Sequence, residues 1–283
     1  MSYIAKLLLV ISILGPFGAL KAHAADDFLG NLYNDSTISF GNLAPNNPLP
    51  QDRIRLFVWN IHKAEDQRLP QDFADLSIGA DLALFQEAVT NPSFVKNITA
   101  ANPEFEWTLA KSFQMFDFNF TGVATAYRVK PLGEEVIVSK VTEPVTETPK
   151  TILLSVFAIN QSYDTLLVAN IHGINFVGLD TYKVQIDQLA AKIRQHHGPM
   201  IVAGDFNTWE PGRMNYLKKI LTPLGLSQVK TPVAGFMDLD HVFIRGMKTQ
   251  FVYDFSNIDS SDHAPLMVDL VFENNKVMMY EGN

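Results

Sequence analysis

The sequence predicts an α/β fold, because short apolar runs rich in β-branched residues alternate with segments that have helical periodicity. The chain has 283 residues, of which 47% are hydrophobic and 18% are charged, as is typical of a globular protein. This length is sufficient for one large α/β domain with a sizeable core. The composition excludes a fibrous or disordered chain. Because the only long apolar run is N-terminal, a protein with several membrane spans is also excluded.

The N-terminal segment has the pattern of a secretory signal peptide. A lysine precedes an apolar stretch over residues 7–20, and Ala22 and Ala24 are the small residues expected before a cleavage site. The stretch is short for a membrane span and contains Pro16, so we expect cleavage after Ala24 rather than an uncleaved anchor. Residues 1–24 contain two lysines and no acid, so their removal changes the formal net charge from −8 to −10. We expect a secreted or periplasmic protein without a stable membrane span.

Charge and cysteine content exclude several classes of function. The chain contains no cysteine, so disulfide bonds, thiolate zinc sites and cysteine nucleophiles are ruled out. An acidic protein has no overall attraction to nucleic acid or anionic phospholipid, and any such binding requires a local site or a metal ion.

The rest of the chain is expected to form a leader and one domain. Residues 25–52 are rich in asparagine and proline and are expected to form an irregular leader. No internal repeat or second linker follows, so residues 53–283 are expected to form a single domain.

Eight apolar runs within this domain have the length and composition of strands, several of them buried on both faces. They are Ile54–Trp59, Leu82–Phe85, Gly122–Tyr127, Ile152–Ile159, Thr165–Ala169, Met200–Ala203, His241–Ile244 and Leu266–Phe272. Apolar residues at helical spacing predict helices over residues 182–193 and 214–224. Residues 88–119 are expected to form a long irregular connection.

Polar side chains gather where these strands end or begin. Asn60, Glu87, His172 and Asp205 follow strands, and Asp240 and the Asp262-His263 pair precede two others. Ligand sites collect where strands open into loops, and carboxylates and carboxamides without thiols suit a hard cation such as Mg²⁺, Mn²⁺ or Ca²⁺. Each residue alone is readily explained as a turn residue, but the ordered set favours one metal-dependent site.

This ordered set resembles the endonuclease/exonuclease/phosphatase superfamily, also called DNase I-like. That group contains secreted DNases, abasic-site endonucleases, inositol-polyphosphate phosphatases and neutral sphingomyelinases. An uncharacterised bacterial branch is similar in addition at Trp59-Asn60-Ile61 and over residues 170–176. The matching segments are Trp59-Asn60, Gln86-Glu87, Asn170-Ile171-His172, Gly204-Asp205-Phe206-Asn207, Asp240 and Ser261-Asp262-His263-Ala264-Pro265.

The resemblance implies a four-layer α/β sandwich, in which two packed and mostly antiparallel β-sheets are flanked by helices. It also implies a divalent metal, Mg²⁺ before Mn²⁺ or Ca²⁺. Glu87 would hold this ion, helped by Asn60 and by Asp262 on the opposite side. Asn170 and Arg128 would contact the substrate, although an arginine at a strand end is more often simply solvated.

The resemblance assigns catalytic roles to five residues. Asp205 and Asn207 would position or activate the attacking water beside the scissile phosphate. His263, oriented by Asp240, would be the general acid/base. His172 would lie near the leaving group. These roles are consistent with hydrolysis of a phosphodiester, because a cation and cationic donors neutralise the phosphate oxygens while a base deprotonates water.

Two features of residues 111–127 stand apart from this pattern. Secreted DNases pair the second histidine with an acid that would fall in this region, where Asp117 is the only acidic residue and is no convincing equivalent. The aromatic-rich run Phe113–Phe120 is expected to be a strand or loop buried in the core. Insertion into a membrane and stacking on nucleobases are the alternatives.

The predicted function is metal-dependent hydrolysis of phosphate esters by a monomer. Nucleic acid is the first expected substrate, with endonucleolytic attack on DNA. Because no basic run is present to bind a duplex backbone, a phosphodiesterase or phosphatase acting on sphingomyelin or inositol phospholipids is the alternative. A non-catalytic secreted binding or toxin-like protein is less favoured, because every metal and histidine position of the pattern is present.

Overall fold

The computed structural model describes residues 36–162, 164–231 and 239–273, so the predicted signal peptide and the first part of the leader lie outside the described residues. A compact unit begins at Thr37. Its first element is strand β1 (Thr37–Gly41), which pairs antiparallel with the strand over Glu106–Gln114. These five residues therefore correct the prediction of an irregular leader. The ring of Phe40 stacks on that of Trp107, with centroids 5.7 Å apart, so a distant partner orders the segment.

The first sheet contains seven strands. Besides β1 they are β2 (Ile54–Asn60), β3 (Leu82–Val89), β4 (Glu106–Gln114), β5 (Phe120–Tyr127), β12 (Met247–Asp254) and β13 (Leu266–Phe272). Their order in the sheet is β1-β4-β5-β3-β2-β13-β12. β2 and β3 are parallel, and the other neighbours are antiparallel.

The second sheet contains six strands. They are β6 (Gly133–Thr142), β7 (Pro149–Ala158), β8 (Thr165–His172), β9 (Met200–Asp205), β10 (Ser227–Gln228) and β11 (Asp240–Arg245). Their order is β10-β11-β9-β8-β7-β6. Only β8 and β9 among these neighbours are parallel. The prediction of two mostly antiparallel sheets is confirmed.

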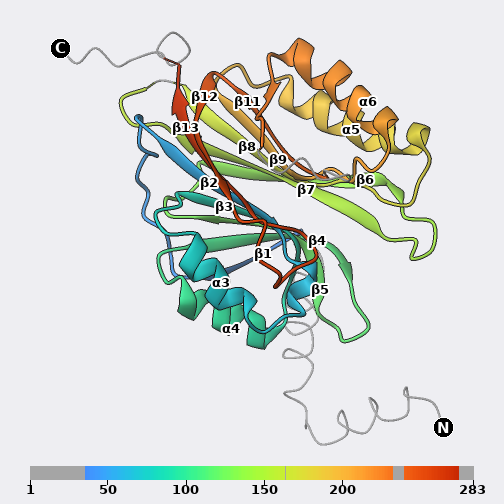
Figure 1. Ribbon diagram of the computed structural model, residues 1–283, viewed down its shortest axis with the longest axis horizontal. Helices are drawn as coiled ribbons and strands as arrows, with labels where there is room; N and C mark the ends of the chain where they lie inside the picture. The colour runs from blue at the N-terminus through green and yellow to red at the C-terminus, as the bar shows by residue number, and fades with distance from the viewer. Residues whose placement is uncertain (1–35, 163, 232–238, 274–283) are drawn as a thin grey trace, which may run out of the picture. The chain divides into compact units, whose positions relative to one another are not determined.

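Helices of the described part of the chain cover the outer faces of the two sheets (Figure 1). α3 (Leu69–Leu76) and α4 (Pro92–Ala101) pack on the first sheet, where their apolar side chains join one buried cluster with those of β2 and β3. α5 (Leu179–Ile193) and α6 (Pro211–Leu221) pack on the second sheet in the same way. A third cluster fills the space between the sheets. The result is the predicted four-layer sandwich, and none of its described helices is long and apolar enough to cross a membrane.

Each of the eight predicted strands overlaps an observed strand, and both predicted helices are present. The irregular connection predicted over residues 88–119 is wrong, because it contains α4 and β4. The Asn91 side chain caps α4 by accepting hydrogen bonds from the backbone N–H groups of Ser93 and Phe94, at 3.0 and 3.2 Å. Pro92 then occupies the first turn, where its missing N–H costs nothing. β4 is ordered by its pairing with β5.

Candidate active site

Strand directions bring the polar residues of the first sheet to one edge. β2 ends at Asn60, and the parallel strand β3 places Glu87 beside it. Glu87 lies at a bulge in the pairing of β3 with β5, and its φ of 54° is in the left-handed region. Because β13 runs antiparallel to β2, the loop before β13 brings His263 to the same edge. Trp59 anchors this loop by donating its indole N–H to the His263 carbonyl, at 2.8 Å.

The second sheet supplies three further side chains at this edge. β8 and β9 are parallel neighbours and end at His172 and Asp205, which are opposite each other in the ladder. β11 runs the other way, so its first residue, Asp240, is also opposite Asp205. The two sheets meet where Asn60 donates a hydrogen bond from Nδ2 to Asp205 Oδ2, at 3.0 Å. Asp205 is therefore the centre of the cluster.

The Asp205 carboxylate is buried among donors from both sheets. Its Oδ1 accepts a hydrogen bond from the backbone N–H of Asn207 at 2.7 Å, and its Oδ2 lies 3.5 Å from His172 Nε2. The Asn207 amide is itself fixed, because Nδ2 donates to the Gly173 carbonyl at 2.8 Å. Burial, together with the charge of Asp240, raises the pKa of Asp205 to about 7. A carboxyl group with this pKa is suited to accept a proton near neutral pH.

His263 and Asp240 form a hydrogen-bonded pair. His263 Nδ1 lies 2.6 Å from Asp240 Oδ2, and Nε2 faces the Asp205 carboxylate at 4.0 Å. Burial by itself lowers the pKa of the His263 ring, but the carboxylates of Asp240, Asp205 and Asp262 outweigh it and raise the pKa to about 9. His263 is therefore an imidazolium at neutral pH, and Asp240 fixes its orientation.

The His263 ring is expected to titrate near pH 9 in the EDTA-treated protein. A raised pKa means that folding favours the protonated ring, so this contribution to stability is fully present below about pH 6.5 and is lost as pH rises through about 9. An NMR titration of the histidine ring signals measures this pKa. Asp240→Asn is expected to lower it, and titration near pH 6.5 in both proteins would contradict the pairing.

His172 has a contrasting environment. It lines a small cavity of about 10 Å³ together with Lys63, Lys150 and Glu87. Burial, reinforced by the charges of Lys150, His263 and Lys63, holds the pKa of His172 well below its usual value. The His172 ring is therefore neutral at neutral pH.

The two lysines beside His172 are site residues to which the sequence analysis assigned no role. Lys63 Nζ lies 2.7 Å from Glu87 Oε2. It projects from the turn 62–64, whose three residues all have positive φ, a strain that proteins retain at functional sites. Lys150 is nearly buried at the start of β7 and lies 3.3 Å from Glu143 Oε1. The only sequence signal for either lysine is its position beside a predicted strand.

Two groups of donors at this edge have the chemistry of divalent-cation ligands. Asn60 and Glu87 offer amide and carboxylate oxygens, which hard cations prefer. Asp205, Asp240 and His263 each offer a ligand atom, and these atoms lie within 4.8 Å of one another. In the second group, however, Asp240 Oδ2 and His263 Nδ1 already satisfy each other. Asn60 Oδ1 and Glu87 Oε2 also have partners, the His62 N–H at 3.1 Å and Lys63 Nζ at 2.7 Å. The set of Asn60 and Glu87 is the better fit because both of its donors are oxygens, which hard cations prefer to an imidazole nitrogen.

Asp262 lies at the solvent-facing side of the site. Its side chain is 59% exposed, and Oδ1 lies 3.8 Å from Nδ1 of His62. The neighbouring Ser261 hydroxyl donates to the Asn60 carbonyl at 2.7 Å and so ties this loop to the end of β2. The structure places Asp262 near the expected ligands, at the rim of the cluster rather than inside it.

Two residues expected to contact substrate do not belong to the site, and these two predictions are corrected. Arg128 follows β5, which is antiparallel to β3, so it lies at the opposite edge and pairs with Glu104 at 2.8 Å. Asn170 is fully buried between the sheets, where Nδ2 donates to the carbonyls of Phe85 and Ala124 at 3.2 and 3.0 Å. Position beside a strand end does not reveal which edge or which face a side chain occupies.

Asn170→Ala is expected to lower the free energy of unfolding by about 2–4 kcal/mol, because it leaves buried carbonyl groups without donors. Chemical denaturation measures this change, and the exposed Asn97→Ala provides a control near zero. Unchanged stability together with a raised KM would restore a substrate-binding role for Asn170.

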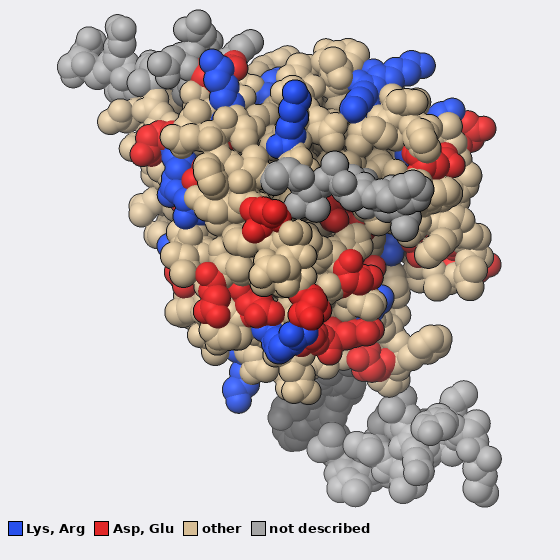
Figure 2. Space-filling model, viewed as in Figure 1, with Lys and Arg blue, Asp and Glu red and all other residues tan. Residues whose placement is uncertain are grey.

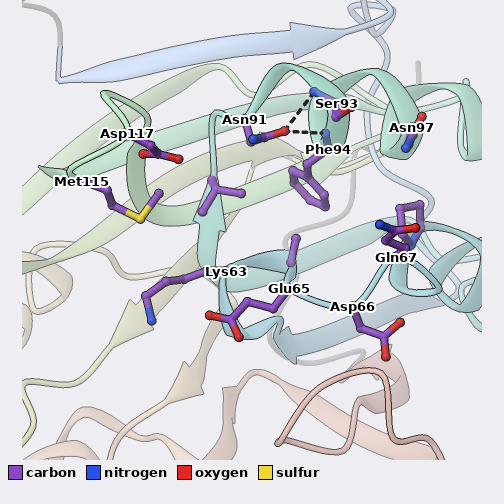
Figure 3. A pocket seen from close by; sticks show the side chains of 13 residues that line it. Lys63, Glu65, Asp66, Gln67, Asn91, Ser93, Phe94, Asn97, Met115 and Asp117 are labelled. Carbon is purple, nitrogen blue, oxygen red and sulfur yellow. Dashed lines mark hydrogen bonds between the residues drawn. The ribbon is translucent and has the colours of Figure 1, made fainter.

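A pocket of about 500 Å³ opens beside Lys63 (Figure 3). Its walls come from the loop that follows Lys63, from the start of α4, and from the turn between β4 and β5 through Met115. The carboxylates of Glu65, Asp66 and Asp117 line it, and Lys63 is the only basic residue among the described residues of the lining. Arg68 pairs with the Asp66 carboxylate at 2.7 Å, so the acidic character of the pocket comes from Glu65 and Asp117.

The chain belongs to the Endonuclease/Exonuclease/phosphatase family, whose model matches residues 57–263, and this membership supports a phosphoesterase or nuclease-like function. It is 33% identical over 236 residues to a UPF0294 protein of Vibrio vulnificus, with 80% of each chain covered. A UPF0294 protein of Yersinia pseudotuberculosis is 34% identical over 233 residues, covering 78% of this chain and 85% of that protein. The predicted family and bacterial branch are thus confirmed.

Solved structures of low sequence identity share the fold. An endonuclease/exonuclease/phosphatase from Beutenbergia cavernae aligns with a TM-score of 0.61 at 16% identity, covering 78% of this chain and 72% of that one. The catalytic domain of human Nocturnin, with bound sulfate, aligns with a TM-score of 0.59 at 17% identity, covering 80% and 96%. TDP2 of D. rerio, in complex with a single-stranded DNA product, aligns with a TM-score of 0.57 at 14% identity, covering 77% of this chain and 98% of that one.

Proposed function

We propose that the protein is a divalent-metal-dependent phosphodiesterase. The observation that carries this proposal is the convergence of Asp205, the His263–Asp240 pair and the Asn60–Glu87 donors at one edge of the two sheets. These polar residues from both sheets serve no evident packing purpose together. This convergence also argues against a binding protein without catalytic activity.

In the proposed reaction, Asp205 accepts a proton from the attacking water, in keeping with its raised pKa. Asn207, held by the Gly173 carbonyl, positions that water. The His263 imidazolium donates a hydrogen bond to a phosphate oxygen, and Asp240 keeps the ring in place. A divalent cation at Asn60 and Glu87, Mg²⁺ first, would supply charge neutralisation of the phosphate.

We propose that the leaving group lies on the other side of the phosphate, beside neutral His172 and its two lysine neighbours. Lys63 and Lys150 both line the cavity that His172 faces. Their ammonium groups offset negative charge that develops on the leaving oxygen. The lysines lower the pKa of His172, whereas an acidic partner would raise it, and the carboxylate beside the ring is that of Asp205, whose Oδ2 lies 3.5 Å from Nε2.

DNA is one candidate substrate. The family includes nucleases, and the structurally similar TDP2 of D. rerio is complexed with a single-stranded DNA product. For this chain, the formal net charge of −8 and the carboxylates that gather over the lower half of the face in Figure 2 oppose approach of a polyanion. The proposed action on DNA therefore requires the cation to overcome this repulsion.

A lipid phosphodiester, with sphingomyelin or an inositol phospholipid as examples, is the second candidate. It is favoured by the pocket beside Lys63, to which Glu65 and Asp117 contribute negative charge. A group that is neutral or cationic fits this lining, whereas the next phosphate of a nucleic acid would be repelled. We rank the lipid substrate above DNA on this observation.

A parallel assay of substrates tests these proposals. Purified protein is incubated with plasmid DNA, RNA, sphingomyelin and phosphoinositides, in Mg²⁺ and in EDTA. We expect metal-dependent release of product from a lipid phosphodiester. Nicking of the plasmid at a higher kcat/KM would assign the site to DNA, and no turnover of any phosphodiester would contradict the proposed enzyme.

We also propose export to the periplasm or the medium. If residues 1–24 are a signal peptide, N-terminal sequencing of the exported protein yields Ala25 first. A mature protein that begins at Met1 or Ser2 would contradict cleavage and favour an uncleaved anchor.

A further inference from the structure

The turn between β4 and β5 exposes two phenylalanines. Phe116 is 107% exposed and Phe118 is 81% exposed, so the expectation that this run is buried in the core is wrong. Backbone hydrogen bonds from Met115 to the Asn119 carbonyl and from Phe118 to the Met115 carbonyl, at 2.8 and 3.0 Å, order the turn. The Asp117 carboxylate reinforces it by accepting from the Asn119 N–H at 3.1 Å. The two rings are therefore held in solvent by a defined turn.

Three further apolar side chains are exposed in loops at the same edge. They are Val145, Phe176 and Trp209, which are 90%, 73% and 42% exposed. Val145 lies between β6 and β7, and the other two follow the ends of β8 and β9, where the cluster is. In Figure 1 the β4–β5 and β6–β7 hairpins both project to the right of the view. These three residues, Phe116 and Phe118 are called the apolar rim.

The four loops that carry the apolar rim have no positive charge. Residues 115–119, 143–148, 175–178 and 208–211 contain four acidic residues and no lysine or arginine. A surface that binds single-stranded nucleic acid combines aromatic rings with a basic groove. These loops provide aromatic rings but no basic groove. Arg213 lies over the Trp209 ring at 4.4 Å but is fully buried, so the surface that the rim exposes is apolar. Such a surface fits an uncharged or zwitterionic partner.

We propose that the apolar rim docks the catalytic edge onto a bilayer of zwitterionic phospholipid. The inference rests on the proposed function, because it explains how a lipid phosphodiester reaches the cluster. Aromatic side chains partition into the headgroup region of a bilayer, where their apolar faces leave water. The rim lies on loops of both sheets at the edge that holds the cluster, so insertion of its side chains would turn the active edge toward the lipid headgroups.

The chain contains an internal probe for this contact. Of its three tryptophans, Trp59 and Trp107 are buried, whereas Trp209 belongs to the apolar rim. Quenching of tryptophan emission by brominated phosphatidylcholine therefore reports on Trp209 at the bilayer. We expect quenching by brominated vesicles and none by vesicles of the same lipid without bromine.

Vesicle sedimentation in EDTA measures docking without hydrolysis, so its failure is distinguishable from failure of the proposed activity. We expect the protein to sediment with phosphatidylcholine vesicles, and the double variant Phe116→Ser, Phe118→Ser to partition at least about tenfold more weakly. The matched control is Leu43→Ser, Ile78→Ser, since both of these side chains are exposed at the opposite edge. The control is expected to bind like the wild type.

Three results would overturn the proposal. Absence of both sedimentation and quenching in the wild type would exclude a bilayer. Binding of a fluorescent oligonucleotide that depends on Phe116 and Phe118, without vesicle binding, would assign the apolar rim to nucleic acid. A dimer in analytical ultracentrifugation that the same double variant abolishes would assign it to a second copy of this chain.

Discussion

Replacement of His263 by alanine is expected to lower kcat by about 10²–10⁴ while the protein remains folded. The reason is geometric: Nε2 of this ring faces Asp205, and Asp240 holds Nδ1 at 2.6 Å. Loss of the ring removes the imidazolium that we propose contacts the phosphate. Turnover per folded molecule, with the folded fraction taken from circular dichroism, measures the effect. His197→Ala is the control, because His197 is exposed after α5.

Asp240→Asn is expected to impair turnover as well, because the amide favours a different tautomer of His263. The double variant should lose far less than the product of the two single losses, since the pair acts as one unit. Full multiplicativity would show that His263 and Asp240 act independently. Lower stability with unchanged turnover of the folded fraction would show that the pair is structural only.

Glu87→Gln is expected to abolish turnover at low Mg²⁺ with little change in the temperature of unfolding. The substitution keeps the shape of the side chain but removes the charge that a hard cation requires. High metal concentration should restore part of the activity. A titration of turnover against Mg²⁺ concentration measures this shift.

The matched control for Glu87 is Glu104→Gln. Glu104 pairs with Arg128 at the opposite edge, so its loss should leave the metal titration unchanged. Wild-type activity of Glu87→Gln at low Mg²⁺ would show that Glu87 is not a metal ligand. It would favour the group of Asp205, Asp240 and His263 as the metal site.

Strands buried on both faces were the predictable part of the fold. A run such as Met200–Ala203 is apolar at every position because both of its faces are covered. β6 and β12 were not predicted, because each lies at the edge of its sheet and exposes many of its residues. β1 has five residues and is ordered by β4, which lies far away in the sequence. Such edge strands depend on partners that local patterns do not show.

The site likewise has features that the sequence predicts and features that only the fold reveals. The positions of Asp205 and His263 follow from short motifs at strand ends, which the sequence displays directly. The contact between Asn60 and Asp205 joins residues 145 positions apart, so only the fold reveals it. Lys63 and Lys150 reach His172 through a strained turn and a neighbouring strand, and Asn170 is buried between the sheets although His172, two residues further on, reaches the site. Orientation and long-range approach are what a local motif cannot specify.

Hydrolysis of bis(4-nitrophenyl) phosphate by the purified chain is the most direct measurement of the proposed chemistry, because this substrate needs neither a lipid surface nor a nucleic-acid groove. Turnover is compared in Mg²⁺ and in EDTA, for the wild type and for Asp205→Asn. We predict turnover that requires Mg²⁺ and falls by at least about 10²-fold in Asp205→Asn. Turnover that is equal in EDTA, or equal in the variant, would contradict a metal-dependent phosphodiesterase centred on Asp205.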